Sequence, residues 1–327
     1  MAALAPDDHA WMDAAARLAA RARPLARPNP GVAALVVAAG CLVSRGWTQP
    51  GGRPHAEAAA LAGLDPATLS AATLYVTLEP CAHQSQRGPA CADLIAATRP
   101  ARVVIGQIDP DPRTAGAGVA RLEAAGIRVS VLDDAASAAS LAGFLARQRL
   151  GRPHVTLKLA MSLDGCIALA DGTSQWITGE AARAHVHAQR ARADAILVGG
   201  RTWRADSPRL DVRLPGLEAR SPRRVVLTRG AAPAGAQAIG APEDIAGLDD
   251  VLYLYIEGGA SAAAAFLAAD LVDELHLYRA PVLIGDGLRA LGPLGLAELG
   301  AAHGRWRLQQ QRQLGSDTFE AYWRTRS

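Results

Sequence analysis

The chain carries Pro54-His55-Ala56-Glu57, followed about twenty residues later by Glu79-Pro80-Cys81-Ala82-His83 and then by Pro89-Ala90-Cys91. One histidine and two cysteines can hold a zinc ion at three corners of a tetrahedron and leave the fourth corner for water. A nearby carboxylate that is not a ligand can move the proton of that water. The pattern therefore predicts a zinc ion held by His55, Cys81 and Cys91, with Glu57 as the catalytic proton carrier.

The combination of these segments is more informative than any one of them. A lone His-x-Glu is a weak signal, and two cysteines in an intracellular chain are usually buried thiols. A histidine and a glutamate at a helix start, then a strand ending in Glu-Pro-Cys, then a second cysteine, favour a zinc-dependent nucleobase deaminase. Such enzymes commonly use Cys-x-x-Cys, whereas ten positions separate Cys81 from Cys91.

Length and composition limit the class of protein. A chain of 327 residues is long enough for two domains, each with its own hydrophobic core. Half of the residues are apolar and a fifth are charged, which is typical of a soluble globular protein. The net charge is only +3 and the arginines are scattered, so we expect no nucleic-acid groove, although a phosphorylated small molecule could still be bound.

Cysteine usage and the N-terminus indicate the compartment. The cysteines are Cys41, Cys81, Cys91 and Cys166. They do not form a disulfide framework for a chain of this size and suit a reducing compartment. Residues 2–11 lack an apolar run of signal-peptide length, and no stretch approaches the ~20 apolar residues of a membrane span. We expect a cytoplasmic protein that does not bind membranes.

Helix and strand periods alternate along the chain and predict an α/β fold with helices on both faces of a sheet. In the first half we expect helices over 7–22, 55–64, 91–98, 116–125 and 133–152, and strands over 32–37, 41–44, 73–78, 103–105 and 127–131. In the second half we expect strands over 154–160, 195–199, 224–228, 251–256 and 274–284, and helices over 179–192 and 261–269. Gly151-Arg152-Pro153 interrupts the alternation, so we predict domains over 1–150 and 151–327.

The first half resembles the deaminase domain of the bifunctional deaminase/reductases of riboflavin biosynthesis. The matching segments are Arg27-Pro28-Asn29-Pro30, Gly46-Trp47-Thr48, residues 51–57, residues 77–83 and Asp109-Pro110-Asp111-Pro112. The resemblance implies a cytidine-deaminase-like three-layer domain and substrate contacts from Asn29 and His83. The loop Gln84–Ala90 is one residue longer than the family usually has, and Asp111 stands where the family usually has asparagine.

Residues 153–325 resemble the reductase domain of the same family, whose fold is similar to dihydrofolate reductase and whose hydride donor is NADPH. The matching segments are residues 156–165, residues 174–178, Ala205-Asp206-Ser207-Pro208 and Glu257-Gly258-Gly259. The resemblance implies that the cofactor contacts Ala160, Trp176, Thr202, Asp206, Gly258, Gly259 and Ala260. It implies substrate contacts from Ser174, Arg190, Leu210, Arg213 and Glu257.

From the residues alone, Glu257-Gly258-Gly259 is the strongest signal in the second half. A strand ends there and a helix begins, which offers free backbone N–H groups to a phosphate. Gly-x-Gly-x-x-Gly does not follow any predicted strand, so a Rossmann dinucleotide site is not indicated. Recognition of the 2'-phosphate of NADPH needs a cation, and Arg201, Arg204 and Arg229 are three equal candidates.

The resemblance implies two successive reactions. The first is zinc-dependent deamination of 2,5-diamino-6-(5-phosphoribosylamino)pyrimidin-4-one, and the second is NADPH-dependent reduction of the ribosyl side chain to ribityl. It also implies a homodimer. Two alternatives stay open: an enzyme that keeps only the reductase, with a structural zinc, or a nucleotide- or RNA-binding module derived from a deaminase. Ammonia release by the zinc-loaded protein and salt-dependent RNA binding distinguish them.

Overall fold

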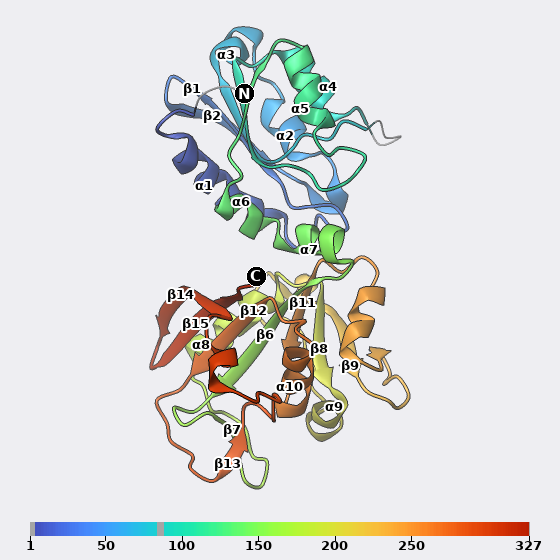
Figure 1. Cartoon of the computed structure of the whole chain (residues 1–327), viewed down its shortest axis with the longest axis vertical. Coiled ribbons are helices and arrows are strands. Elements are labelled where there is room, and N and C mark those ends of the chain that lie inside the picture. Colours follow the sequence, from blue (N-terminus) through green and yellow to red (C-terminus); the bar gives the residue numbers. More distant parts are fainter. Residues whose placement is uncertain (1–3, 84–87, 327) are drawn as a thin grey trace. The chain divides into compact units, whose positions relative to one another are not determined.

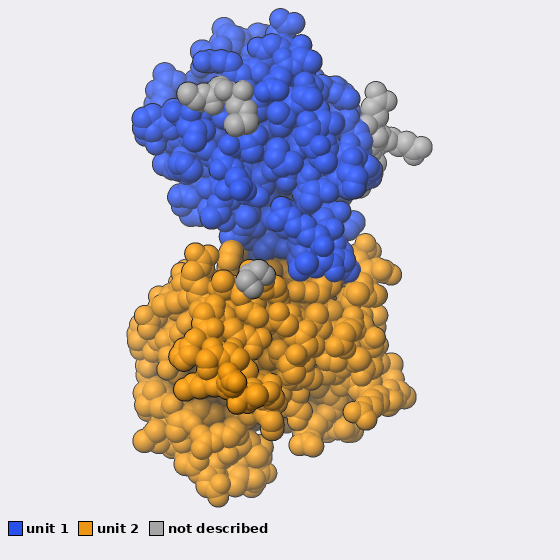
Figure 2. All heavy atoms as spheres, viewed as in Figure 1, with its two compact units in different colours: residues 1–151 blue, residues 152–327 orange. Residues whose placement is uncertain are grey.

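The computed structural model describes residues 4–83 and 88–326, and the chain divides into two compact units, residues 1–151 and 152–327 (Figure 2). The change of unit falls beside Gly151, which ends a helix in the left-handed conformation (φ +68°). Each unit is built on its own sheet and has its own hydrophobic clusters.

The first unit contains a five-stranded sheet in the order β2-β1-β3-β4-β5. Its strands are β1 (Ala33–Ala38), β2 (Cys41–Trp47), β3 (Thr73–Leu78), β4 (Arg102–Gln107) and β5 (Arg128–Val131). β1 pairs antiparallel with β2 and β3, whereas β3, β4 and β5 are parallel. The carboxyl ends of β3 and β4 therefore lie side by side at one edge of the sheet.

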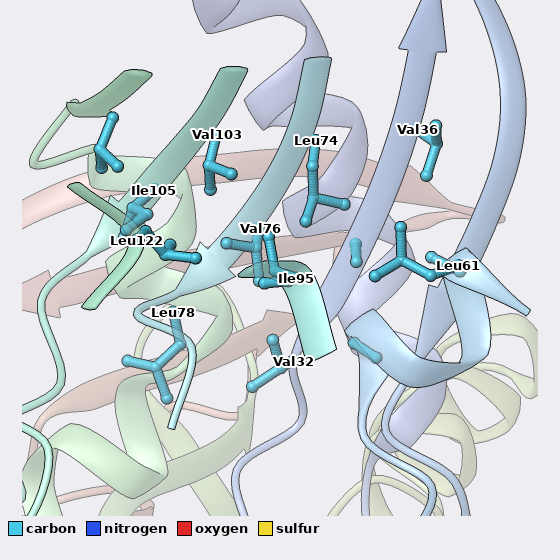
Figure 3. Close-up of a cluster of buried hydrophobic side chains, with 14 of the residues drawn as sticks. Val32, Val36, Leu61, Leu74, Val76, Leu78, Ile95, Val103, Ile105 and Leu122 are labelled. Carbon is cyan, nitrogen blue, oxygen red and sulfur yellow. The ribbon is translucent and has the colours of Figure 1, made fainter. Parts of the chain in front are cut away.

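Helices cover both faces of this sheet (Figure 1). They are α1 (Asp8–Ala19), α2 (Ala56–Leu61), α3 (Pro66–Ala71), α4 (Cys91–Thr98), α5 (Ala117–Ala124), α6 (Ala135–Ser140) and α7 (Ala142–Leu150). Side chains of a strand alternate between the faces. Leu74 and Val76 pack with Ile95 of α4 on one face (Figure 3), while Tyr75 packs with Met12 of α1 on the other. The result is a three-layer helix–sheet–helix unit.

The second unit contains an eight-stranded sheet in the order β10-β9-β8-β11-β6-β12-β15-β14. Its strands are β6 (His154–Met161), β8 (Ala195–Gly199), β9 (Arg223–Leu227), β10 (Gln237–Ile239), β11 (Tyr253–Glu257), β12 (Glu274–Arg279), β14 (Trp306–Leu314) and β15 (Asp317–Arg324). The strands from β10 to β12 are parallel, and β15 and β14 continue antiparallel. A separate two-stranded sheet joins β7 (Cys166–Leu169) to β13 (Gly287–Arg289).

The second unit has three α-helices in its described part: α8 (Glu180–Arg190), α9 (Gly200–Asp206) and α10 (Ala260–Ala268). Phe266 of α10 belongs to the core cluster on one face of the large sheet, with Leu197 and Leu254. Val186 of α8 belongs to the cluster on the other face, with Tyr255. Leu254 and Tyr255 are neighbours on β11, so their opposite directions follow from the two-residue period of a strand.

Several element boundaries differ from the sequence-based expectation. The helix expected over 7–22 ends at Ala19 and continues only as a short 3₁₀ turn, and the helix expected over 133–152 is two helices that meet at Leu141. The strand expected over 274–284 ends at Arg279, where its parallel partner β6 ends and Pro281 follows. A proline has no N–H to continue a ladder. Helix α9 and the β14–β15 hairpin were not predicted.

In the first unit, a buried ion pair connects helix α1 to the sheet. The Asp8 carboxylate accepts hydrogen bonds from Nη1 (2.9 Å) and Nη2 (2.7 Å) of Arg102 on β4 and from the Tyr75 hydroxyl (2.9 Å) on β3. Burial raises the pKa of Asp8, but the bonds from Arg102, the Ala5 N–H and Tyr75 outweigh it and leave that pKa below its usual value.

We predict that Asp8→Ala lowers the unfolding free energy of the first unit by about 3–5 kcal/mol, because it leaves a buried guanidinium without its carboxylate. Hydrogen exchange of peptides from β3 and β4 measures this loss, and the paired Asp8→Leu/Arg102→Met variant should recover most of it.

In the wild type, the stability that the Asp8–Arg102 pair contributes is complete above the ordinary aspartate pKa and disappears as the pH falls through the lower pKa of folded Asp8. Equal exchange in the wild type and Asp8→Ala would contradict this.

Candidate functional sites

The first candidate site lies where two helices begin beside the end of a strand. His55 is the residue before α2, Cys91 is the first residue of α4, and Cys81 follows β3 by three positions. Gly46 on β2 permits the close approach of α2, because a Cβ at Gly46 would lie 2.3 Å from the Ala56 carbonyl oxygen. The two helix starts and the strand end thus bring together residues from three parts of the sequence.

The three predicted ligand atoms converge. His55 Nδ1 lies 3.2 Å from Cys91 Sγ and 3.7 Å from Cys81 Sγ, and the three atoms all lie within 4.8 Å of one another. Zinc bonds of about 2.3 Å to sulfur and 2.0 Å to nitrogen at a tetrahedral angle separate such atoms by about 3.5 Å. The hydrogen bond between the two thiols lowers the pKa of Cys81 and raises the pKa of Cys91, so without a metal the pair favours one thiolate, at Cys81. The donor set fits a zinc ion.

Glu57 lies in the first turn of α2, two residues after His55, and only 3% of it is exposed. Burial raises the pKa of its carboxyl to about 6, against the opposing influence of His55. The interaction with Cys91 brings this carboxyl to the edge of the His55–Cys81–Cys91 cluster. A carboxyl that is buried beside the cluster and outside its three converging atoms has the position that a proton carrier needs.

Sequence reasoning missed Glu79, which is buried directly before Pro80-Cys81. Its carboxylate accepts hydrogen bonds from the N–H groups of Asp109 (3.2 Å), Gly116 (3.0 Å) and Val119 (3.0 Å). These bonds tie the loop after β4 and the start of α5 to the turn that carries Cys81. The residue stood inside the quoted motif, but a glutamate that serves only backbone donors has no sequence signature.

The two predicted substrate residues of the first unit, Asn29 and His83, lie in different loops. Asn29 packs against Gly52 (φ +83°). A Cβ atom at position 52 would lie 1.7 Å from the Nδ2 atom of Asn29. His83 follows Cys81 by two residues, and its Nδ1 atom is buried without a hydrogen-bond partner among the described residues. The altered loop Gln84–Ala90 falls partly outside the described residues, since 84–87 are not described.

The second candidate site is a cavity of about 1540 Å³ in the second unit. Its lining includes all twelve residues predicted for this half: Ala160, Ser174, Trp176, Arg190, Thr202, Asp206, Leu210, Arg213, Glu257, Gly258, Gly259 and Ala260. Single-ligand pockets commonly occupy about 300–1,000 Å³. The cavity therefore has room for a dinucleotide and a second molecule together.

The glycines at the carboxyl ends of β8 and β11 allow the backbone to come close to a ligand. A Cβ at Gly258 would lie 3.1 Å from the Ala262 Cβ, and one at Gly259 would lie 3.2 Å from the Thr202 Oγ1. Gly259 is the residue before α10, and Gly259, Ala260 and Ser261 line the cavity, so the helix begins at the cavity wall, where its first N–H groups are free for a ligand. This cradle fits the phosphates of a nicotinamide cofactor. Arg201, Arg204 and Arg229 all line the same cavity, which does not rank them.

A largely buried trio of charged side chains also lines the cavity. Glu257 accepts hydrogen bonds from Arg190 Nε (2.6 Å) and Nη2 (3.0 Å), and Lys158 Nζ lies 3.7 Å from Glu257 Oε2. Burial lowers the pKa of Lys158 despite the neighbouring Glu257 carboxylate. Burial raises the pKa of Glu257, but Arg190 and Lys158 together bring it below its usual value. The trio contains an anion held between two cations.

Lys158 was not predicted as a site residue, although it is the single lysine of a chain with 33 arginines. The sequence did offer one signal for Lys158: the single lysine of the chain lies in a strand whose buried side chains are apolar. Arg183 was also missed. Its guanidinium lies over the ring of Trp176 at 4.9 Å, and that ring is 64% exposed at the cavity, so Trp176 is not a core aromatic.

Among the helices that the structure describes, none combines the length and apolar character required to span a bilayer.

Two family models match the chain in succession. The model described as "Cytidine and deoxycytidylate deaminase zinc-binding region" matches residues 5–107, and "RibD C-terminal domain" matches residues 153–241 and 246–319. The riboflavin biosynthesis protein RibD of Escherichia coli is 36% identical, with 95% of this chain and 97% of that protein covered. That of Mycobacterium tuberculosis is 38% identical, with 89% of each covered.

Solved structures agree with these matches. RibD of Acinetobacter baumannii superposes with a TM-score of 0.85 at 33% identity, covering 98% of this chain and 99% of that chain. A deaminase/reductase of Thermotoga maritima superposes with a TM-score of 0.85 at 29% identity, covering 97% and 99%. The predicted fold class, a cytidine-deaminase-like domain followed by a reductase domain, is confirmed. The chain therefore belongs to the RibD family, the bifunctional deaminase/reductases of riboflavin biosynthesis.

Proposed function

We propose that residues 1–150 deaminate 2,5-diamino-6-(5-phosphoribosylamino)pyrimidin-4-one with a zinc ion held by His55, Cys81 and Cys91. The observation that supports this most strongly is the convergence of their three ligand atoms beside the buried Glu57. When bound, zinc would activate a water for attack on the ring carbon that carries the 2-amino group. Glu57 accepts the proton of that water and delivers it to the departing amine, which leaves as ammonia.

Residues 151–327 then reduce the ribosyl group of the deaminated product to ribityl, and NADPH would supply the hydride to C1'. The support is the cavity with its glycine cradle and the charges of Lys158, Arg190 and Glu257. Opening the ribose ring requires a proton on its ring oxygen. Lys158, whose pKa burial lowers, is an ammonium group suited to donate that proton, and Glu257 holds it in position.

The arrangement of charges refines the role of the predicted substrate residues. Both carboxylate oxygens of Glu257 accept from Arg190, and Arg190 Nη1 also donates to the Asp211 carbonyl oxygen (2.9 Å). Arg190 is therefore fixed before the substrate enters. Arg213 is half exposed and lies 3.6 Å from the Asp211 carboxylate, so it has more freedom to meet the 5'-phosphate of the substrate.

We predict that Glu57→Gln retains zinc and loses about 10²–10⁴-fold in the rate of ammonia release, the range typical for removal of a general acid–base group. Metal content measured by mass spectrometry and an ammonia assay on the same sample test this. NADPH oxidation with the deaminated substrate should stay at the wild-type rate, which controls for misfolding. Ammonia release by Glu57→Gln at the wild-type rate would remove Glu57 from the mechanism. If the zinc-loaded wild type releases no ammonia, a reductase-only enzyme is favoured.

We predict that Lys158→Met lowers kcat for NADPH oxidation by about 10²–10³-fold and leaves ammonia release unchanged. In the wild type, kcat should fall as the pH rises through the pKa of Lys158, because the acid must be protonated, and this limb should lie below the ordinary lysine pKa. The limb should be missing from the residual activity of Lys158→Met. A pH profile with the same limb in both proteins would assign the proton to another group.

A further inference from the structure

An ion pair in the first unit belongs to neither proposed site. The Asp111 carboxylate accepts hydrogen bonds from Arg113 Nε at 3.0 Å to each oxygen and from Arg113 Nη2 at 2.5 Å. The Arg113 backbone N–H adds a further bond of 2.9 Å to Asp111 Oδ1. Asp111 is 8% exposed, whereas 68% of the Arg113 side chain faces solvent. A surface guanidinium thus closes over a buried carboxylate.

This pair is the outer end of a chain of hydrogen bonds that starts beside the zinc ligands. Glu79, two residues before Cys81, accepts from the Asp109 N–H (3.2 Å). Asp109 Oδ1 accepts from the Asp111 N–H (2.9 Å), and Asp111 in turn is held by Arg113. β3 and β4 are parallel, so the loop after β4 runs next to the turn that carries Cys81. Arg113 is therefore connected to that turn through three carboxylates.

The three carboxylates Glu79, Asp109 and Asp111 gather negative charge at this edge of the sheet. Burial, together with the charges of Asp111, Glu79 and Cys81, raises the pKa of Asp109 to about 6. Asp111 has the opposite tendency, because the hydrogen bonds of Arg113 lower its pKa, with a smaller effect of His83. Within the described residues, Arg113 forms the ion pair that offsets this negative charge.

We propose that Arg113 is a positioning residue of the deaminase: it neutralises Asp111 and holds the loop 109–116 against the turn that carries Cys81. The inference rests on the proposed deaminase site of the first unit. An uncharged asparagine at position 111 could still accept the backbone N–H of residue 113, but it would bring no charge that needs a partner. Arg113 is therefore required because residue 111 is an aspartate, whose buried charge it pairs.

The test compares Arg113→Ala, Asp111→Asn and the double variant in the zinc-loaded full chain. We expect Arg113→Ala to lower kcat/KM for ammonia release about 10- to 100-fold, as misplacement of a site loop commonly does. Asp111→Asn in the Arg113→Ala background should restore most of that loss. Zinc content and NADPH oxidation should stay unchanged in all variants. Arg121→Ala, which breaks the half-exposed pair between Arg121 on α5 and Asp93 on α4, is the matched control and should behave as wild type.

Hydrogen exchange of peptides covering 109–119 gives a readout that does not depend on activity. Arg113→Ala should exchange faster there, and the double variant should return toward the wild-type rate. Wild-type ammonia release and exchange in Arg113→Ala would overturn the inference, as would a double variant as impaired as the single one. If the wild type itself releases no ammonia, the proposed deaminase fails, and the exchange rates still decide whether Arg113 holds the loop.

Discussion

The N-termini of α2 and α4 face the carboxyl end of β3, and the first site depends on this meeting. It requires α2 to press against β2, which Gly46 permits because it has no Cβ to strike the Ala56 carbonyl oxygen. It also requires the turn after β3 to keep one shape, which the three backbone bonds to Glu79 provide. Gly118 also allows α5 to pack closely against this turn, because a Cβ at Gly118 would lie 2.2 Å from the Pro80 carbonyl oxygen. A metal site needs ligands held in place before the ion arrives, and these contacts supply that order.

The second unit uses the same edge of a parallel sheet with different chemistry. Its cavity gathers the ends of β6, β8 and β11, where Lys158, Gly199 and Glu257 lie on three neighbouring strands. Ligands of open α/β sheets bind at the carboxyl ends of strands because the loops there converge and helix N–H groups point outward. In the first unit this edge presents thiols and an imidazole. In the second it presents glycine backbone and buried charges, which suit phosphates and a sugar.

The sequence predicted the elements and residues that have a local signature. The convergence of His55, Cys81 and Cys91 could be predicted because residue type and spacing can be read from the sequence, and the turn at Glu257-Gly258-Gly259 because a strand, two glycines and a helix follow one another. Glu79 and the hairpin β14–β15 escaped for physical reasons. The bonds of Glu79 reach up to 40 positions along the chain. Most of β14 is exposed, so apolar residues do not alternate along it in the way that identifies a strand.

Buried charge is the constraint that sequence reasoning handles least well, because its meaning depends on partners that only the fold supplies. Arg190 and Glu257 were both expected to contact the substrate, and the fold pairs them with each other, while Lys158 joins them from the adjacent strand. Removing Glu257 leaves two neighbouring cations without their shared anion, and an uncompensated charge at such a largely buried position is strongly destabilising. Such a trio adds little to the stability of a fold, because desolvation of the charges offsets their attraction. It does hold the Lys158 ammonium group, whose pKa is lowered, at a fixed position. Its position in the cavity is therefore better explained by the chemistry of the reductase than by the stability of the sheet.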